Sequence, residues 1–243
     1  MSATAAMATT TPPPVPPTPP RGVAISGIVF SALYITSLLL IRIAVPAHPK
    51  DPGHWLADAS LRSWVQIALN LVPFTGIAFL WFMAALRVRI GLLEDRLLST
   101  VFIGSGLLFV AMLFAAVALS QGLLGTFGSA MALPGESEAY RITRGMVHAL
   151  MNPFGIRMAA VFMFVTSTIG LRTARLSRWI SYVGYTFGLV LLLIITDFAW
   201  IAVLFPGWVL LVSVWLLYAE FHKNRSQRCE RSLSERQPHR PDA

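Results

Sequence analysis

Three polar residues recur at intervals of four in an otherwise apolar stretch of the sequence. At 100° per residue, Arg144, His148 and Asn152 form a stripe about 80° wide along one side of a helix. If that helix crosses a membrane, the stripe runs from the outer interface to about a third of the way in. A guanidinium, an imidazole and a carboxamide at that level could line a pocket for a polar solute.

Further polar residues are expected at a similar depth on other helices. Asn70 falls within one apolar run, Arg42 near the outer end of another, and Asp197 at or near the outer end of a third. Together the six groups could line an outward-facing pocket. In the alternative interpretation, Arg144 and His148 are interfacial, and the two asparagines tie helices together through hydrogen bonds of about 0.6 kcal/mol or more.

Arg157 is the single charge in the apolar run MNPFGIRMAAVFMFV, residues 151–165. At 1.5 Å per residue it lies about 15 Å from the outer end of its span and about 21 Å from the inner end, too far to reach either surface easily. Insertion scales assign about 2.5–3.5 kcal/mol to a central arginine. We therefore expect its guanidinium to face the bundle interior, bonded to helix-end or kink carbonyls, to Asn70, or to Asp197 if that residue is buried.

Pro153 is expected to interrupt the helix that carries these groups. It removes one backbone donor and disfavours helical geometry at Asn152, so a kink is predicted there. Arg157 lies about 140° around a regular helix from Asn152, so the two share a pocket only if the kink reorients them. A purely structural arginine is the alternative. The full set of candidate pocket residues is Arg42, Asn70, Arg144, His148, Asn152, Arg157 and Asp197.

The composition indicates whether the chain belongs in water or in a membrane. Hydrophobic residues make up 56% of the sequence, charged residues only 12%, and the mean hydropathy is +0.66. Such a chain belongs in a bilayer. The net charge is +8, but the charged residues lie between apolar runs and at one tail, with no basic helix face, so membrane orientation explains them better than nucleic-acid binding does.

The apolar runs predict an all-α, polytopic transmembrane bundle of six spans, because about 20 residues cross a hydrocarbon core of about 30 Å. The predicted spans are 22–45, 64–86, 98–119, 147–171, 179–196 and 200–220. They form a domain over 22–221, between a disordered Pro/Thr-rich tail over 1–21 and a disordered basic tail over 222–243.

The last two spans share one apolar block, so their boundary is open. A turn at Asp197-Phe198 makes Pro206 a kink in the sixth span. The alternative is a turn at Phe205-Pro206-Gly207, which buries Asp197 within the fifth span.

Lysines and arginines favour one orientation of these spans in the cell membrane. With both termini cytoplasmic, the inside segments hold Arg21, Arg87, Arg89, Arg96, Arg172, Arg175, Arg178, Lys223, Arg225, Arg228, Arg231, Arg236 and Arg240. These are 13 of the 19 basic residues, and six remain outside or within spans. The positive-inside rule therefore predicts both termini in the cytoplasm.

No catalytic, cofactor or metal site is predicted. Only His148 lies within a span, whereas a membrane haem needs facing histidines. His48, Asp51 and His54 could offer three metal ligands, but they belong to a short, Pro-rich outer loop where polar residues are expected anyway. The sequence has no Cys-x-x-Cys, no phosphate-binding glycine loop and no supported Ser-His-Asp arrangement. The single cysteine, Cys229, excludes an internal disulfide.

A weak internal repeat suggests transport. The string ALNLVPFTGI (68–77) resembles ALMNPFGI (149–156), and both Pro73/Pro153 and Gly104/Gly184 are 80 residues apart. Parallel repeats occur in transporters, although short apolar matches also arise by chance. The GxxxG of Gly184 and Gly188 permits close helix approach, either within the bundle or in a homodimer.

Two segments resemble a group of uncharacterised multi-pass integral membrane proteins of actinobacterial type. The first, residues 79–116, has a short inside loop with Arg87, Arg89, Gly91 and Glu94-Asp95-Arg96, followed by a helix with Gly104-Ser105-Gly106. The second, LFPGWVLLVSVWLLY (204–218), resembles the final span of that group. The resemblance covers residues 22–220 and implies a multi-pass fold without indicating an activity or a site.

Two classes of function remain open. One is a small-solute or ion transporter with an outward-facing pocket, which would need a homodimer because six spans are few for a transporter. The other is a non-transporting accessory or assembly subunit whose polar residues are structural. An enzyme is disfavoured because no acid–base pair converges. The expected partners are the lipid bilayer, with anionic lipid at the basic C-terminal tail.

Overall fold

The computed structural model describes residues 21–45, 54–56, 58–90, 96–127, 137–173, 176–193 and 199–234. Within these ranges all regular structure is helical. The elements in chain order are α1 (Arg21–Ala44), η1 (His54–Leu56), α2 (Ala59–Ile90), α3 (Arg96–Phe127), α4 (Glu138–Ala149), the π-helical η3 (Leu150–Gly155), α5 (Ile156–Thr173), α6 (Arg178–Leu193), η4 (Ala199–Val203) and α7 (Leu204–Ser234).

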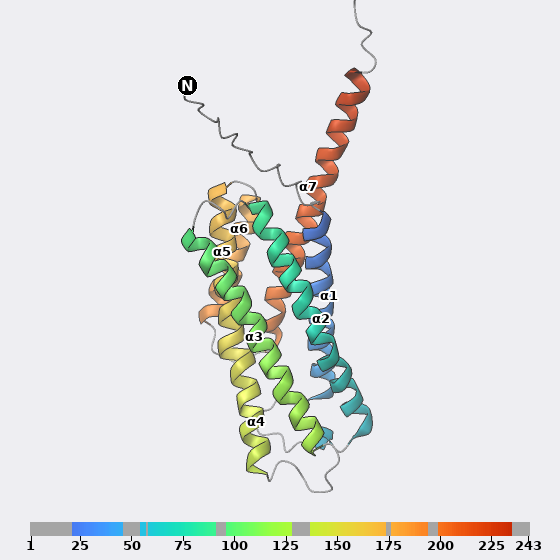
Figure 1. The fold of residues 1–243 in the computed structure, drawn as a ribbon, viewed down its shortest axis with the longest axis vertical. Coiled ribbons are helices and arrows are strands. Elements are labelled where there is room, and N and C mark those ends of the chain that lie inside the picture. The colour runs from blue at the N-terminus through green and yellow to red at the C-terminus, as the bar shows by residue number, and fades with distance from the viewer. Residues whose placement is uncertain are drawn as a thin grey trace, which may run out of the picture.

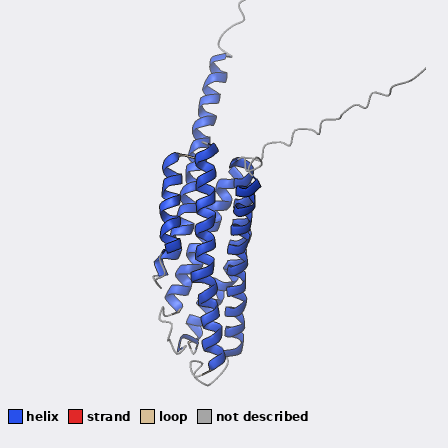
Figure 2. Ribbon diagram, turned by 90° about the vertical axis from the view of Figure 1, so that its left-hand side faces the viewer, coloured by secondary structure: helices blue, strands red, loops and turns tan. Residues whose placement is uncertain are grey.

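The long helices run side by side along one axis, and α7 projects beyond the others at one end (Figures 1 and 2). We call this end the tail end; α1 begins there, α2 ends there and α3 begins there. At the opposite end, which we call the loop end, α2 begins, α3 ends and α4 begins (Figure 1). The direction of the chain therefore alternates from helix to helix through this part of the bundle.

Five helical stretches are long and apolar enough to cross a membrane: Gly22–Ala44, Ala59–Arg89, Arg96–Phe127, Glu138–Thr173 and Ile201–Ala219. The predicted multi-pass helical architecture is thus supported. The remaining apolar helix, α6, has 16 residues and a length of about 24 Å, less than a hydrocarbon core of about 30 Å. The number of six crossings remains a prediction.

The centre of the bundle is aromatic. Phe79 of α2 packs against Phe30 of α1, Phe109 of α3, Phe162 of α5 and Phe205 of α7, with ring centroids 5.0, 5.4, 5.2 and 5.7 Å away. All five side chains are at most 3% exposed. We call these five residues the aromatic layer. It joins five helices across the bundle and forms the centre of the core.

The predicted interruption at Pro153 coincides with η3, a π-helical turn between α4 and α5. Proline cannot donate to the carbonyl four residues earlier, which explains why the regular α-helical pattern is lost there. Pro206, by contrast, lies in the first turn of α7, where backbone N–H groups have no partner within the helix. The alternative turn at residues 205–207 is therefore wrong, and Asp197 lies outside the described residues.

Several helices are longer than the predicted spans. The fourth helical stretch begins at Glu138 rather than at residue 147, because hydropathy detects only the part within the bilayer. The largest difference is at α7, which continues to Ser234 although disorder was predicted from residue 222. A helix already fixed by packing extends without a new nucleation step, and the polar continuation contains good helix formers and neither Gly nor Pro.

Candidate functional site

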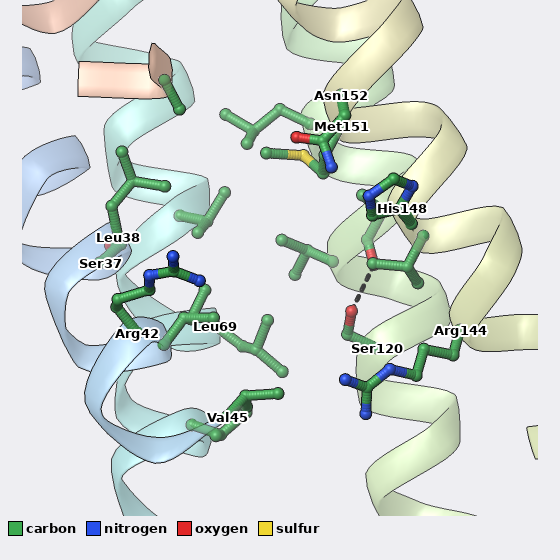
Figure 3. Close-up of a pocket in the computed structure, with 18 of the residues that line it drawn as sticks. Ser37, Leu38, Arg42, Val45, Leu69, Ser120, Arg144, His148, Met151 and Asn152 are labelled. Carbon is green, nitrogen blue, oxygen red and sulfur yellow. Dashed lines mark hydrogen bonds between the residues drawn. The ribbon is translucent and has the colours of Figure 1, made fainter. Parts of the chain in front are cut away.

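A cavity of about 330 Å³ lies in the loop-end half of the bundle. Its walls come mainly from α1, α2, α3, α4 and η3. Single further residues are Val45 after α1, Trp55 of η1, Ile156 of α5, and Ala202 and Val203 of η4. Figure 3 shows α1 on one side of the cavity and the α4–η3 helix on the other. A cavity of this size is at the lower end of the range for small-molecule sites.

The described part of α6 does not contribute to the wall of the cavity. α6 packs antiparallel on α5, with Gly170 beside Ser181 near the tail end and Gly188 beside Ala160 and Phe164 farther along. At this register the last described residue of α6, Leu193, lies near the start of α5.

Two arginines point into the cavity from opposite walls (Figure 3). Arg42 comes from the last turn of α1, and Arg144 comes from α4. The Nη1 of Arg144 donates a hydrogen bond of 2.9 Å to the hydroxyl of Tyr140, one turn earlier, which orients the guanidinium. Arg42 has no hydrogen-bond or ion-pair partner among the described residues.

Other polar groups line the same space. His148 and Asn152 continue the wall that carries Arg144 (Figure 3). The hydroxyl groups of Ser37 and Ser120 donate to carbonyls of their own helices, at 2.9 Å to Leu33 and 2.8 Å to Ala116. These two serines thus donate within their own helices, and the larger polar side chains of the wall are Arg42, Arg144, His148 and Asn152.

The charged side chains among the described lining residues, Arg42 and Arg144, are both positive. No aspartate or glutamate is found among its lining residues in the described part of the chain. Arginine is permanently charged, and its planar guanidinium matches the geometry of carboxylate and phosphate groups. Two such groups facing one space, with low-dielectric walls around them, attract an anion.

The structure places four of the seven predicted pocket residues in the cavity wall: Arg42, Arg144, His148 and Asn152. Asn70 is exposed on the outside of α2, because Val65, Leu69 and Val72 are the α2 residues that face the cavity. This corrects the prediction for Asn70.

Arg157 does not line the cavity either. It is half-buried on the side of α5 that also carries Phe154, which is 54% exposed three residues earlier. The π turn at η3 therefore does not bring Arg157 round to the wall formed by Asn152. This corrects the expectation that the two residues share a pocket.

Several cavity residues were not predicted. Tyr140 lies four residues before Arg144, so the same spacing that identified the stripe would have included it. Trp55 is buried in the cavity wall, and its indole Nε1 has no acceptor among the described residues. No sequence pattern indicated Trp55, because its place depends on how η1 folds back under the bundle.

No metal centre is found in the described part of the chain, where no three or more His, Cys, Asp or Glu side chains cluster. His48 and Asp51 lie outside the described residues. Comparisons of the chain with known protein families, with curated proteins and with solved structures give no match. The geometry and charge of the cavity are therefore the observations that bear on function.

Proposed function

We propose that this integral membrane protein binds a small anionic solute in the cavity, as a step in moving that solute across the membrane. The observation that carries the proposal is the pair of guanidinium groups, from Arg42 and Arg144, directed into one cavity from opposite walls.

The neighbours of the arginines support an anion rather than a cation. The hydroxyl of Tyr140, which accepts a hydrogen bond from Arg144, is a neutral group. A carboxylate or phosphate between the two walls could accept hydrogen bonds from both guanidinium groups, with His148 and Asn152 close by as further donors. A cation would meet two positive charges and no acid among the described lining residues.

The position of the cavity is compatible with one half of a transport cycle. If both termini are cytoplasmic, the loop end faces outward and the cavity receives solute from that side. On its inner side the ring of Tyr34 stacks on Phe30 at 5.6 Å and contacts Phe109 at 6.0 Å, so the aromatic layer closes the way to the tail end. Transport would require this layer to open after the solute has bound.

The same layer favours a second candidate, a non-transporting accessory subunit. Its five rings are almost completely buried and join five helices, which is expected of a static core. In this case the anion would be a ligand that the protein senses or presents to a partner.

Thermal unfolding in nanodiscs of neutral phosphatidylcholine tests the binding step. We expect at least one of acetate, inorganic phosphate and decanoate, at constant ionic strength, to raise the midpoint of the wild-type protein. The double variant Arg42→Gln/Arg144→Gln should lose this response. Arg141→Gln should keep it, because Arg141 is exposed on the same helix and does not line the cavity. Equal responses in all three proteins, or no response to any anion, would overturn the proposal.

Flux measurements then separate the two candidates. Proteoliposomes loaded with the stabilising anion should release it faster than liposomes that contain the double variant, if the protein is a transporter. Binding without flux would assign the protein to the accessory class.

A further inference from the structure

The cavity is mostly apolar although two charges enter it. Sixteen of its 25 lining residues are aliphatic or methionine, so a small hydrophilic anion would contact only a minor part of the wall. Water in the remaining space would find few hydrogen-bond partners there. The wall therefore suits a ligand that is itself mostly apolar.

Part of the apolar wall lies inward of the two arginines along the bundle axis. On α1, Arg42 lies eight residues nearer the loop end than Tyr34, a rise of about 12 Å. On the opposite wall, Arg144 lies twelve residues before Ile156, a rise of about 18 Å. Beyond the arginines, toward the aromatic layer, the wall includes Leu113. An occupant with its anionic group at the arginines would thus extend an apolar part inward.

α1 and α4 form facing walls of the cavity. α1 packs on α2 and α7, whereas α4 packs on α3 and η3, so α1 and α4 face each other across the cavity rather than packing together. One lining residue on each of these facing helices is accessible, since Leu39 is 41% exposed and His148 is exposed. Leu39 lies on an apolar helix that is long enough to cross the membrane.

We propose that the ligand is a single-chain anionic amphiphile, a carboxylate or phosphate head on a hydrocarbon chain, that enters from the bilayer between α1 and α4. This inference rests on the proposed binding of an anion and names its class. The head lies between Arg42 and Arg144, and the chain fills the apolar part of the cavity against the aromatic layer. The cavity volume of about 330 Å³ suits one medium-length chain rather than a two-chain phospholipid.

Photocrosslinking with a medium-chain fatty acid that carries a diazirine at its tail tests the proposal. The full-length protein is placed in nanodiscs of neutral phosphatidylcholine, and labelled peptides are mapped by mass spectrometry. We expect labelling at deep cavity residues such as Leu113 and Ile156. An excess of decanoate should suppress this labelling, whereas acetate and the neutral decanol should not. Decyl phosphate as competitor then shows whether the head is a carboxylate or a phosphate.

Matched variants connect the label to the arginines. A hydrogen bond to a charged group contributes about 1.5–3 kcal/mol, so Arg42→Gln and Arg144→Gln should each raise the decanoate concentration needed for half-competition at least about tenfold. Arg141→Gln should leave it unchanged. Arg42→Lys keeps the charge and should retain most of the affinity, which distinguishes a lost contact from a misfolded protein.

The outcomes separate this inference from the proposed function. One outcome is that acetate or inorganic phosphate stabilises the protein through the arginines while the probe labels only lipid-facing residues such as Trp81. The ligand is then a small anion, and the proposal of an amphiphilic ligand is wrong. If the probe labels the cavity equally in wild type, Arg42→Gln and Arg144→Gln, the apolar wall binds a chain without the arginines. In that case the anion-binding function fails as well.

Discussion

The position of Arg157 around its helix determines that its side chain does not line the cavity. It is half-buried outside the cavity, and the packing of Gly188 beside Ala160 places the C-terminal end of α6 level with it. That end carries a partial negative charge, which stabilises a nearby cation by about 0.3–1 kcal/mol. Of the two roles open from the sequence, the structural one agrees better with this position.

We therefore expect Arg157→Leu to keep anion binding. Removal of a central arginine relieves an insertion cost of about 2.5–3.5 kcal/mol, more than the loss of the helix-end interaction. The thermal midpoint in nanodiscs should stay the same or rise, and the anion-induced shift should persist. Loss of that shift in Arg157→Leu, as in the double variant Arg42→Gln/Arg144→Gln, would show that the arginine acts on the cavity after all.

A second prediction for a single residue concerns Gly184. A Cβ added there would collide with the Ser167 hydroxyl and lie 2.8 Å from the Trp208 Nε1, and all three residues are buried. Gly184→Ala should destabilise the protein by about 1–3 kcal/mol through overpacking. Gly104→Ala is the matched control, because nothing lies within 4 Å of its added Cβ. Unfolding in mixed micelles with increasing SDS measures both, and equal stability of the two variants would contradict this account.

The candidate site could be predicted where helical periodicity applies. Arg144, His148 and Asn152 share a wall because residues four apart lie on one side of a helix, and the π turn begins late enough to keep them together. Asn70 was placed by depth alone. Depth along a helix does not specify direction around it, and only the packing of α2 on its neighbours shows which side of it faces the cavity.

At the scale of elements, the π turn η3 joins the cavity wall to the packed core. In Pro153→Ala the new N–H can donate to the carbonyl of Ala149, so the segment can return to α-helical geometry. A π turn accommodates one residue more than an α-helical turn. Conversion of the segment to α-helical geometry would therefore rotate α4 relative to α5 by about 100°. Arg144 would then leave the cavity.

We expect Pro153→Ala to weaken anion binding several-fold without lowering the thermal midpoint. Pro73→Ala is the matched control, because Pro73 lies in the regular helix α2, is exposed and does not line the cavity. Anion titrations of both variants, with hydrogen exchange across residues 149–155, would follow the effect. Unchanged affinity together with newly protected amides in that segment would rule out a role for η3 in shaping the site.

The elements themselves were largely predictable, and their ends were not. Apolar length alone locates the helices, because any backbone within the bilayer must satisfy its own hydrogen bonds. It could not show that α4 begins at Glu138, well before the predicted span, or that α7 continues to Ser234. It also paired Gly104 with Gly184 as a repeat, yet an added Cβ has open space at the first and none at the second.

At the scale of the whole molecule, the glycine pair of α6 is used inside the bundle, so the predicted homodimer needs another surface. Asn70 is exposed on the lipid-facing side of α2, together with Gln66 one turn earlier. A carboxamide both donates and accepts, so two copies could pair through it. Native mass spectrometry should detect a dimer that Asn70→Leu weakens, with Ile77→Leu as a neutral exchange on the same side. A wild-type protein that is monomeric at all concentrations would contradict the predicted homodimer.

The orientation of the molecule decides which side of the membrane supplies the ligand. Arg87 and Arg89 at the end of α2 and Arg96 at the start of α3 gather at the tail end, from which α7 also projects. The positive-inside rule therefore predicts a cytoplasmic tail end and an outward-facing cavity.

Cys229, the only cysteine, lies on α7 five residues before its end. An impermeant thiol reagent should label it only after the cells are permeabilised. The variant Cys229→Ser/Glu138→Cys, with its new thiol at the exposed start of α4 at the loop end, should react in intact cells. The opposite pattern would turn the cavity toward the cytoplasm, and the amphiphile would then be drawn from the inner leaflet.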